Sequence, residues 1–225
     1  FMLIFPGKVQ AVVLFHDDFD DGNANGWTID YLTPVAGSGS WNNSKWEVNS
    51  DGQYGISFSN FQMRTVSFVE KTNFSSYIFT FRLIGKSGAD KNIIFRYKYK
   101  NNWYNFHLRD DGIRLGIMKN GVYSDNNGKI LSDFHLINNT VYSIKIIVNS
   151  DLISLLVNNQ PVVENLEVVD NFISEGKVAL YASTGDFFPY TSIYFDDIVI
   201  CTLDDSHNCD YPADYFHRTP VVIVP

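Results

Sequence analysis

Apolar and polar residues alternate along most of this chain. Residues 77–83 place Tyr, Phe, Phe and Leu at every second position, with Ile, Thr and Arg between them. The same period of two recurs in residues 104–108, 113–117 and 142–148, and turns rich in Gly, Asn or Asp separate these segments. Such alternation predicts strands that bury one face.

The expected strands recur about every eight to twelve residues, which is the spacing of a β-sandwich. We therefore predict an all-β fold, a two-sheet antiparallel β-sandwich of the jelly-roll type with roughly twelve to fifteen strands. This is too many for an immunoglobulin domain of about seven strands. Leu115 and Ile144 are expected on inward faces, and no segment has the periodicity of a long helix.

Residues 191–201, TSIYFDDIVIC, form the expected final strand of the sandwich. Phe195, Ile198 and Ile200 are its expected inward residues, but the gap from Phe195 to Ile198 is odd. A strand alternates with a period of two, so the odd gap predicts a β-bulge at Asp196–Asp197. Such a bulge would turn one carboxylate toward the rim of the sandwich.

Residues 16–27, HDDFDDGNANGW, place four Asp within five positions near the other end of the chain. We expect this loop and the bulge to meet around a structural calcium ion, because calcium prefers about six to eight hard oxygen ligands. Two acidic segments brought together would repel one another without a cation. The alternative is a solvated acidic turn and a bulge whose acids are capped by hydrogen bonds. The candidate calcium ligands are Asp18, Asp20, Asp21, Asp196 and Asp197.

A polar face is expected opposite the core. Sugars stack on Trp or Tyr rings and form hydrogen bonds with planar Arg and Asn groups, so these residue types in neighbouring strands indicate a glycan groove. The alternative is an ordinary solvent-facing sheet surface, which is polar in most antiparallel sheets. The candidate ligand-binding residues are Trp103, Asn105, His107, Arg109, Arg96, Arg114 and Arg82.

Composition and short motifs indicate which partners and which cellular compartment to expect. The formal net charge is −8, which disfavours nucleic acid, and no basic amphipathic stretch indicates membrane insertion. Residues 1–11 resemble the end of a secretory signal peptide, so we expect a secreted or cell-surface protein; an extra N-terminal strand is the alternative. Cys201 and Cys209 either close a small disulfide loop in an exported protein or remain two thiols.

Residues 12–203 are the expected extent of the sandwich, and residues 204–225 are expected to be a linker followed by the start of another domain. The closing TPVVIVP, residues 219–225, is similar to the opening of some α/β-hydrolases, which would make a hydrolase domain a partner in the same chain. The alternative is a final edge strand.

Several short motifs occur in one order along residues 14–201. They resemble the laminin G-like and concanavalin A-like lectin/glucanase superfamily, and the resemblance implies a jelly roll that often binds glycans and often carries a structural calcium. Some members are glycosidases, including 3-keto-disaccharide hydrolases. The motifs are Asp17-Asp18-Phe19 with Gly26-Trp27, Trp46-Glu47-Val48, Asp51-Gly52, Phe95, Asn102-Trp103-Tyr104 with Phe106, residues 142–148, Val157-Asn158, residues 176–181 and Phe195-Asp196-Asp197-Ile198.

Catalytic patterns are missing from the sequence. The E-x-D-x-x-E strand motif of the retaining β-glucanases in this superfamily is absent, and the expected polar face holds no pair of carboxylates. No G-x-S-x-G motif or phosphate-binding loop occurs. The sequence therefore indicates a secreted, non-catalytic carbohydrate-binding module of a larger protein, whose partner is a polysaccharide or glycan. The alternatives are a glycosidase of the same superfamily and a structural or protein-interaction spacer.

Overall fold

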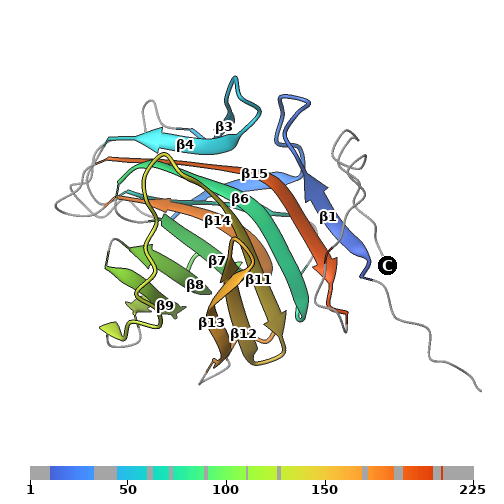
Figure 1. Cartoon of the computed structure of the whole chain (residues 1–225), viewed down its shortest axis with the longest axis vertical. Coiled ribbons are helices and arrows are strands. Elements are labelled where there is room, and N and C mark those ends of the chain that lie inside the picture. Colours follow the sequence, from blue (N-terminus) through green and yellow to red (C-terminus); the bar gives the residue numbers. More distant parts are fainter. Residues whose placement is uncertain are drawn as a thin grey trace, which may run out of the picture.

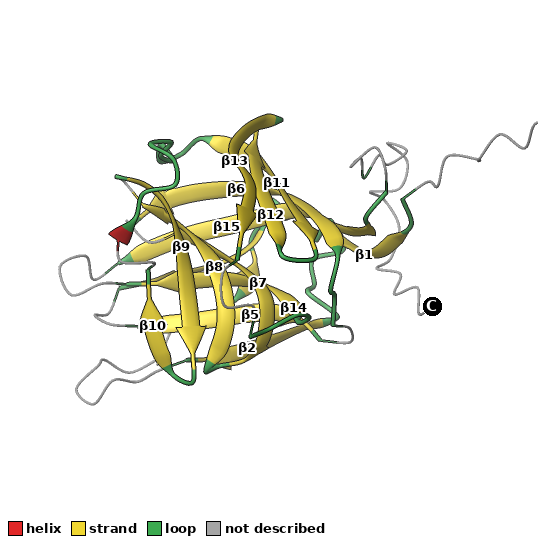
Figure 2. Ribbon diagram, turned by 90° about the horizontal axis from the view of Figure 1, so that it is seen from below, coloured by secondary structure: helices red, strands yellow, loops and turns green. Residues whose placement is uncertain are grey.

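Two antiparallel sheets pack face to face (Figures 1 and 2). The computed structural model describes residues 11–32, 45–59, 63–70, 73–88, 91–109, 111–125, 128–168, 172–184, 190–204 and 209. Within these ranges there is no α-helix, and so no helix that is long and apolar enough to cross a membrane. The predicted all-β sandwich is confirmed.

One sheet has eight strands. Of the described strands, the last lies near the middle of this sheet, and the first pairs with it. In spatial order the eight-stranded sheet contains β13 (Gln160–Glu167), β12 (Leu152–Val157), β11 (Val141–Asn149), β6 (Tyr77–Ser87), β15 (Thr191–Thr202), β4 (Tyr54–Phe58) and β3 (Glu47–Val48), with β1 (Val13–Asp17) beside β15.

The other sheet has seven strands. The hairpin-connected strands β7, β8, β9 and β10 form one half of it, and β14 joins them to the remaining strands. In spatial order the seven-stranded sheet contains β10 (Val122–Ser124), β9 (Gly112–Lys119), β8 (Asn102–Arg109), β7 (Lys91–Tyr99), β14 (Lys177–Ser183), β5 (Arg64–Val69) and β2 (Trp27–Tyr31).

The core fills the space between the sheets, as the alternation predicts. Phe79 and Phe81 of β6 lie in it with ring centroids 4.5 Å apart, and Phe195 of β15 packs against Phe81. Leu115 and Ile144 are both buried in this core, which confirms their expected inward orientation. Burying each such side chain contributes roughly 1.5–3 kcal/mol, so the core accounts for most of the favourable free energy of folding.

A second apolar cluster covers part of the opposite face of the seven-stranded sheet, which we call its outer face. This face is partly apolar, because apolar residues come to it from β5, β7, β8, β9 and β14. The cluster consists of Val66, Phe68, Ile94, Tyr97, Trp103, Met118, Ala179 and Tyr181.

A bulge interrupts β7. Arg96 has a φ of 57°, and the register between β7 and β8 shifts between Phe95 and Tyr99. The bulge reverses the alternation, so Phe95 lies in the core between the sheets whereas Tyr97 lies in the outer cluster. Simple alternation along residues 95–99 would place Phe95 and Tyr97 on one face, and the bulge is the reason that they lie on opposite faces.

The two ends of the sandwich meet. Asp17 of β1 pairs with Ile198 of β15. The register of β15 with β6 shifts between Asp196 and Val199, and Asp197 has a φ of 49°, so the predicted bulge at Asp196–Asp197 is confirmed. A disulfide joins Cys201 to Cys209. The expected signal segment and the expected start of another domain lie outside the described residues, apart from Ala11.

Candidate functional site

A row of polar side chains crosses β7, β8 and β9 on the outer face. Asn105 lies opposite Gly116 and His107 lies opposite Arg114 in the β8–β9 pair. The amide nitrogen of Asn105 donates a hydrogen bond to Asn92 Oδ1 on β7 at 3.1 Å. We call this row, completed by Arg109 and by Tyr123 of β10, the polar track. The sequence placed Asn105, His107, Arg109 and Arg114 together correctly, but it missed Asn92 and Tyr123.

Asn105 forms the buried floor of the polar track. Its side chain is 1% exposed, and its Oδ1 has no hydrogen-bond partner within the described residues. A Cβ at position 116 would overlap Asn105 Oδ1 and the Tyr123 hydroxyl, so glycine at this position makes room for both groups. Leaving a buried acceptor unsatisfied costs roughly 1–3 kcal/mol, a cost that a hydroxyl donor from a ligand would offset.

Arg114 is an anchor at the edge of the track. Its guanidinium donates to both carboxylate oxygens of Asp111, at 2.7 and 2.8 Å, and to the carbonyl oxygen of Gly128 at 3.3 Å. These hydrogen bonds from Arg114 lower the pKa of Asp111 to about 2. Arg109 is more open, with a side chain that is 42% exposed and a single 3.7 Å contact from Nε to the same carboxylate. Of these two arginines, Arg109 is therefore the better placed to contact a ligand.

Trp103 lies on the expected face, but it is 1% exposed and cannot form an open platform for a sugar ring. Its ring centroid is 5.8 Å from those of both Tyr123 and Tyr181, and its indole Nε1 donates to the carbonyl oxygen of Lys100 at 3.1 Å. The expectation of an exposed Trp103 is wrong because this face carries its own apolar cluster. Trp103 supports the polar track from the side through its contact with Tyr123.

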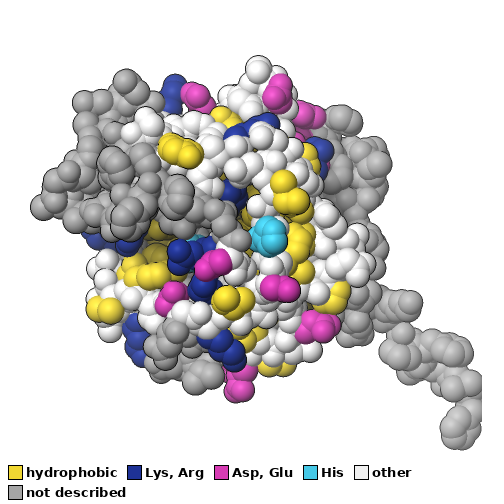
Figure 3. Space-filling view, turned by 60° about the vertical axis from the view of Figure 1, so that its left-hand side comes forward, with side chains coloured by type: hydrophobic (Ala, Val, Ile, Leu, Met, Phe, Trp, Pro, Cys, Tyr) yellow, Lys and Arg dark blue, Asp and Glu magenta, His cyan; other side chains and the backbone are white. Residues whose placement is uncertain are grey.

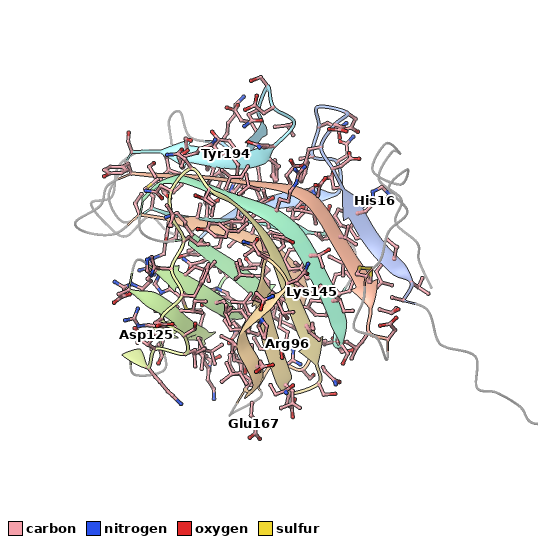
Figure 4. The ribbon with its side chains drawn as sticks, viewed as in Figure 1. His16, Arg96, Asp125, Lys145, Glu167 and Tyr194 are labelled. Carbon is pink, nitrogen blue, oxygen red and sulfur yellow. A yellow bond between two sulfur atoms is a disulfide. The ribbon has the colours of Figure 1, made fainter. Side chains whose placement is uncertain are left out.

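Two of the predicted ligand-binding arginines lie elsewhere. Arg96 is fully buried, because the β7 bulge turns it away from the outer face, and it donates to the carbonyl oxygens of Ile173, at 3.1 Å, and Ser150 (Figure 4). Arg82 belongs to β6 of the other sheet, where it forms ion pairs with Asp196 and Asp197. Neither residue belongs to the polar track, and the placement of both with it was wrong.

The bulge acids and the N-terminal loop form what we call the acidic rim, which contains Asp18, Asp20, Asp196 and Asp197. Because Asp17 pairs with Ile198 in an antiparallel ladder, Asp18 and Asp197 follow at adjacent positions. Burial and the neighbouring charge of Asp197 raise the pKa of Asp196 to about 6, against the opposing effect of Arg82, and Asp20 also acts on it. The two acidic segments therefore lie close enough to interact.

The carboxylates of the rim differ in the hydrogen bonds and ion pairs that they already form. Asp18 Oδ2 is buried without a hydrogen-bond partner in the described residues, and burial raises the pKa of this carboxyl. Asp196 and Asp197 share Arg82, and Asp21 accepts a hydrogen bond from the Asn23 backbone amide. Within the described ranges, no three His, Cys, Asp or Glu residues are grouped so that they could hold a metal ion.

Asp17 is a further acid of the N-terminal loop, and it was not among the candidate calcium ligands. Its Oδ2 accepts a 2.8 Å hydrogen bond from the Trp27 indole and its Oδ1 accepts one from the Phe19 amide at 3.0 Å. Phe19, Trp27 and Tyr54 pack against one another beside it. Burial raises the pKa of Asp17 to about 7, although both hydrogen bonds oppose the shift. The aromatic residues that flank the run of Asp residues in the sequence could have indicated that Asp17 lies in an apolar environment.

Among the described residues, the surface near β8 and β9 carries side chains of both charges. Figure 3 turns the left-hand side of Figure 1 forward, where β8 and β9 lie, and shows Lys or Arg side chains next to Asp or Glu side chains. The ion pairs of Asp111 with Arg109 and Arg114 are of this kind. Charge attraction alone therefore does not define the ligand of this face.

No known family profile matches the sequence, and no curated protein sequence matches it. Among solved structures, the fold is similar to carbohydrate-binding module CBM66 from Bacillus subtilis. The TM-score is 0.54 and the identity is 16%, over 79% of this chain and 96% of that one.

Two further solved structures share the fold. The chain matches SCLam, a non-specific endo-β-1,3(4)-glucanase from family GH16, with a TM-score of 0.62 and 9% identity over 89% of this chain and 93% of that one. It also matches the Emp47p carbohydrate recognition domain, with a TM-score of 0.55 and 11% identity over 84% of this chain and 95% of that one. The concanavalin A-like jelly roll predicted from the sequence is thus confirmed as a fold.

Proposed function

We propose that this chain is a carbohydrate-binding β-sandwich module and that its glycan lies along the polar track. Asn105 is the observation that carries the proposal, because its buried carbonyl oxygen is held beside Gly116 without a donor among the described residues. A sugar hydroxyl is a suitable donor for such an oxygen. The similarity to a carbohydrate-binding module and to a carbohydrate recognition domain supports the same assignment.

The track offers a sugar both rigid and adjustable contacts. Asn105 is fixed by Asn92, so its carbonyl oxygen is already oriented before a ligand arrives. Arg109 supplies exposed guanidinium donors, and Tyr123, which is 37% exposed, supplies an aromatic edge next to the track. The Tyr123 hydroxyl lies 3.4 Å from His107 Nδ1, so the two polar side chains border the same part of the track.

Binding without hydrolysis is the activity we infer for this face. Glycosidases of the common type hold two carboxylates across the scissile bond, roughly 5–9 Å apart. The strands of the seven-stranded sheet carry one carboxylate, Asp30 of β2, and this carboxylate accepts a 2.8 Å hydrogen bond from the Tyr97 hydroxyl. The hydrolase alternative draws on the similarity to SCLam, and release of reducing ends from β-glucans would favour it.

A structural calcium ion at the acidic rim is part of the proposal. Asp18 Oδ2 needs a cation or a donor, and Arg82 is the counter-charge that the described residues place at the rim. The charge of Asp20 reaches Asp196, so Asp18 and Asp20 of the loop and Asp197 of the bulge would be the candidate carboxylate ligands, and calcium would draw its remaining ligands from backbone carbonyls and water. We also infer export, because the Cys201–Cys209 disulfide suits an oxidising compartment.

A glycan array followed by calorimetry tests the proposed function. Arg109→Ala and Tyr123→Ala each remove an exposed side chain from the track, so the fold is expected to persist while affinity for the best glycan falls about tenfold. Glu47→Ala changes an exposed side chain on β3, at the far edge of the other sheet, and is the control. Equal affinity in all three variants would show that the glycan binds elsewhere. Failure to retain any glycan would favour a structural spacer.

A further inference from the structure

A hollow lies on the eight-stranded sheet, whereas the polar track lies on the seven-stranded sheet. Its volume is about 290 Å³, and β11, β12 and β13 line it with the side chains that face away from the core. This volume is near the lower end for small-molecule pockets, which begin at roughly 300 Å³. The lining residues are Ile147, Asn149, Leu152, Ser154, Leu156, Pro161, Glu164 and Asn165.

A bulged edge strand forms one wall of the hollow. The register between β12 and β13 shifts twice, and Asn165 has a φ of 46°. The Asn165 backbone amide donates to Ser154 Oγ at 2.9 Å, which fixes the bulge against β12. The bulge brings Glu164 and Asn165 to the hollow one after the other, although adjacent residues of a regular strand face opposite sides.

Apart from Ser154, whose Oγ holds the bulge, the polar side chains of the hollow are uncommitted within the described residues. Glu164 is exposed and is the one charged residue of the lining, and the described residues give its carboxylate no hydrogen bond or ion pair. The side-chain amides of Asn149 and Asn165 are likewise uncommitted within those ranges. In the polar track, by contrast, Asn105 and Arg114 already engage neighbouring side chains.

The floor of the hollow is aliphatic. Ile147 and Leu156 are half-buried there, and Leu152 is 42% exposed. A carboxylate and two amides around an aliphatic floor match a sugar ring, which presents several hydroxyls around its edge and a C–H surface on one face. A purely apolar ligand would leave Glu164 desolvated without a partner. A polyanion would be repelled by Glu164 and by Glu167 at the end of β13 (Figure 4).

We propose that this hollow is a second saccharide subsite that accepts one or two uncharged sugar units. The inference rests on the proposed carbohydrate-binding function and adds a site on the opposite sheet. Two subsites on opposite sheets would let one module bridge two glycan chains, because a single chain would have to pass around the edge of the sandwich. Edge protection by Pro161, the bulge and two Glu residues is the competing explanation of this wall.

Amide NMR titration of the whole chain with cellotetraose and with laminaritetraose tests the proposal. We expect the backbone amides of Ser154 and Asn165 to shift and to saturate independently of those in β8. The double variant Asn149→Ala with Glu164→Ala should abolish these shifts, or weaken them at least tenfold, and leave the β8 shifts unchanged. Glu167→Ala is the matched control, since it removes an exposed acid of the same strand that does not line the hollow.

The outcomes separate this subsite from the proposed function. Shifts confined to β8 and its neighbours would overturn the second subsite and leave the proposed function standing. Shifts in β12 and β13 that survive the double variant would also overturn it. Shifts confined to β12 and β13 would support the subsite and contradict the polar track as a glycan site. No shift with either sugar, in a chain that retains a different glycan on an array, would mean that the wall serves only to protect the edge.

Discussion

Asp17→Asn should remove a pH-dependent loss of stability. Burial raises the pKa of Asp17 from its ordinary 3.8 to about 7, so the folded state keeps the proton over a range in which the unfolded chain has lost it. The sign follows from proton linkage. The stabilisation is fully present below pH 3.8 and is lost progressively as the pH rises to 7, because the folded state binds more protons than the unfolded state in that window.

The magnitude follows from the width of the window. Each pH unit between the two pKa values is worth about 1.4 kcal/mol, so the two units from about pH 5 to pH 7 correspond to roughly 3 kcal/mol of unfolding free energy. An asparagine in place of Asp17 would be neutral at every pH and would escape this loss. Its side chain can accept from the Trp27 indole or from the Phe19 amide through one oxygen only, so the variant loses one hydrogen bond, worth about 1 kcal/mol.

Urea unfolding in the presence of a chelator, at pH 5 and at pH 8, provides the assay. At pH 5 the lost hydrogen bond offsets most of the gain, so the variant and the parent should agree within about 1 kcal/mol, whereas at pH 8 the variant should be more stable by about 3 kcal/mol. Asp196→Asn is a control for another acid with a raised pKa, and it should leave the Asp17 part of the pH dependence in place. Parallel stability curves for the parent and Asp17→Asn would refute the reasoning, because they would show that Asp17 ionises in the folded state as it does in water.

Three further predictions address the acidic rim, the outer cluster and the disulfide. If calcium binds the rim, calcium at a hundredfold excess over Kd should stabilise the fold by about 2.7 kcal/mol. The Asp18→Asn variant should abolish the calcium-dependent rise in Tm. A Tm that changes with neither chelator nor calcium would contradict the site. Trp103→Ala should cost about 3–5 kcal/mol in urea unfolding because Trp103 is buried, and an unchanged midpoint would contradict that burial. Cys201→Ser with Cys209→Ser should lower Tm, since the disulfide restricts the unfolded chain, and an equal Tm would show that the loop adds no stability.

The fold was predictable because its signal is local. Alternation with a period of two determines which side chains face inward, and neither Leu115 nor Ile144 requires a long-range contact for that assignment. The bulge in β15 could also be predicted from the sequence, because its inward residues Phe195 and Ile198 are an odd number of positions apart. The β7 bulge could not be predicted in this way, because Phe95 and Tyr97 are an even number of positions apart and yet lie on opposite faces of the sheet.

The candidate sites depend on information that a single strand does not contain. Trp103 alternates like a solvent-facing residue, and only the neighbouring strands show that Met118 and Tyr181 join it in an apolar cluster. Arg82 was grouped with other arginines by its residue type, whereas the register of β6 against β15 places it opposite Asp196. Pairing between strands far apart in the sequence sets such contacts, and periodicity within one strand cannot specify it.

The β15 bulge connects the fold to the chemistry of the acidic rim. In a regular strand Asp196 and Asp197 would face opposite sides, and one of the two carboxylates would enter the apolar core. The bulge instead lets both reach Arg82 while Phe195 and Ile198 remain inside. Asp18 and Asp20 add further negative charge to the rim, and the raised pKa of Asp196 is the result of burial together with neighbouring carboxylates that Arg82 only partly offsets. A bound cation would lower this pKa toward its ordinary value, so titration of the Asp196 carboxyl with and without calcium measures the occupancy of the rim directly.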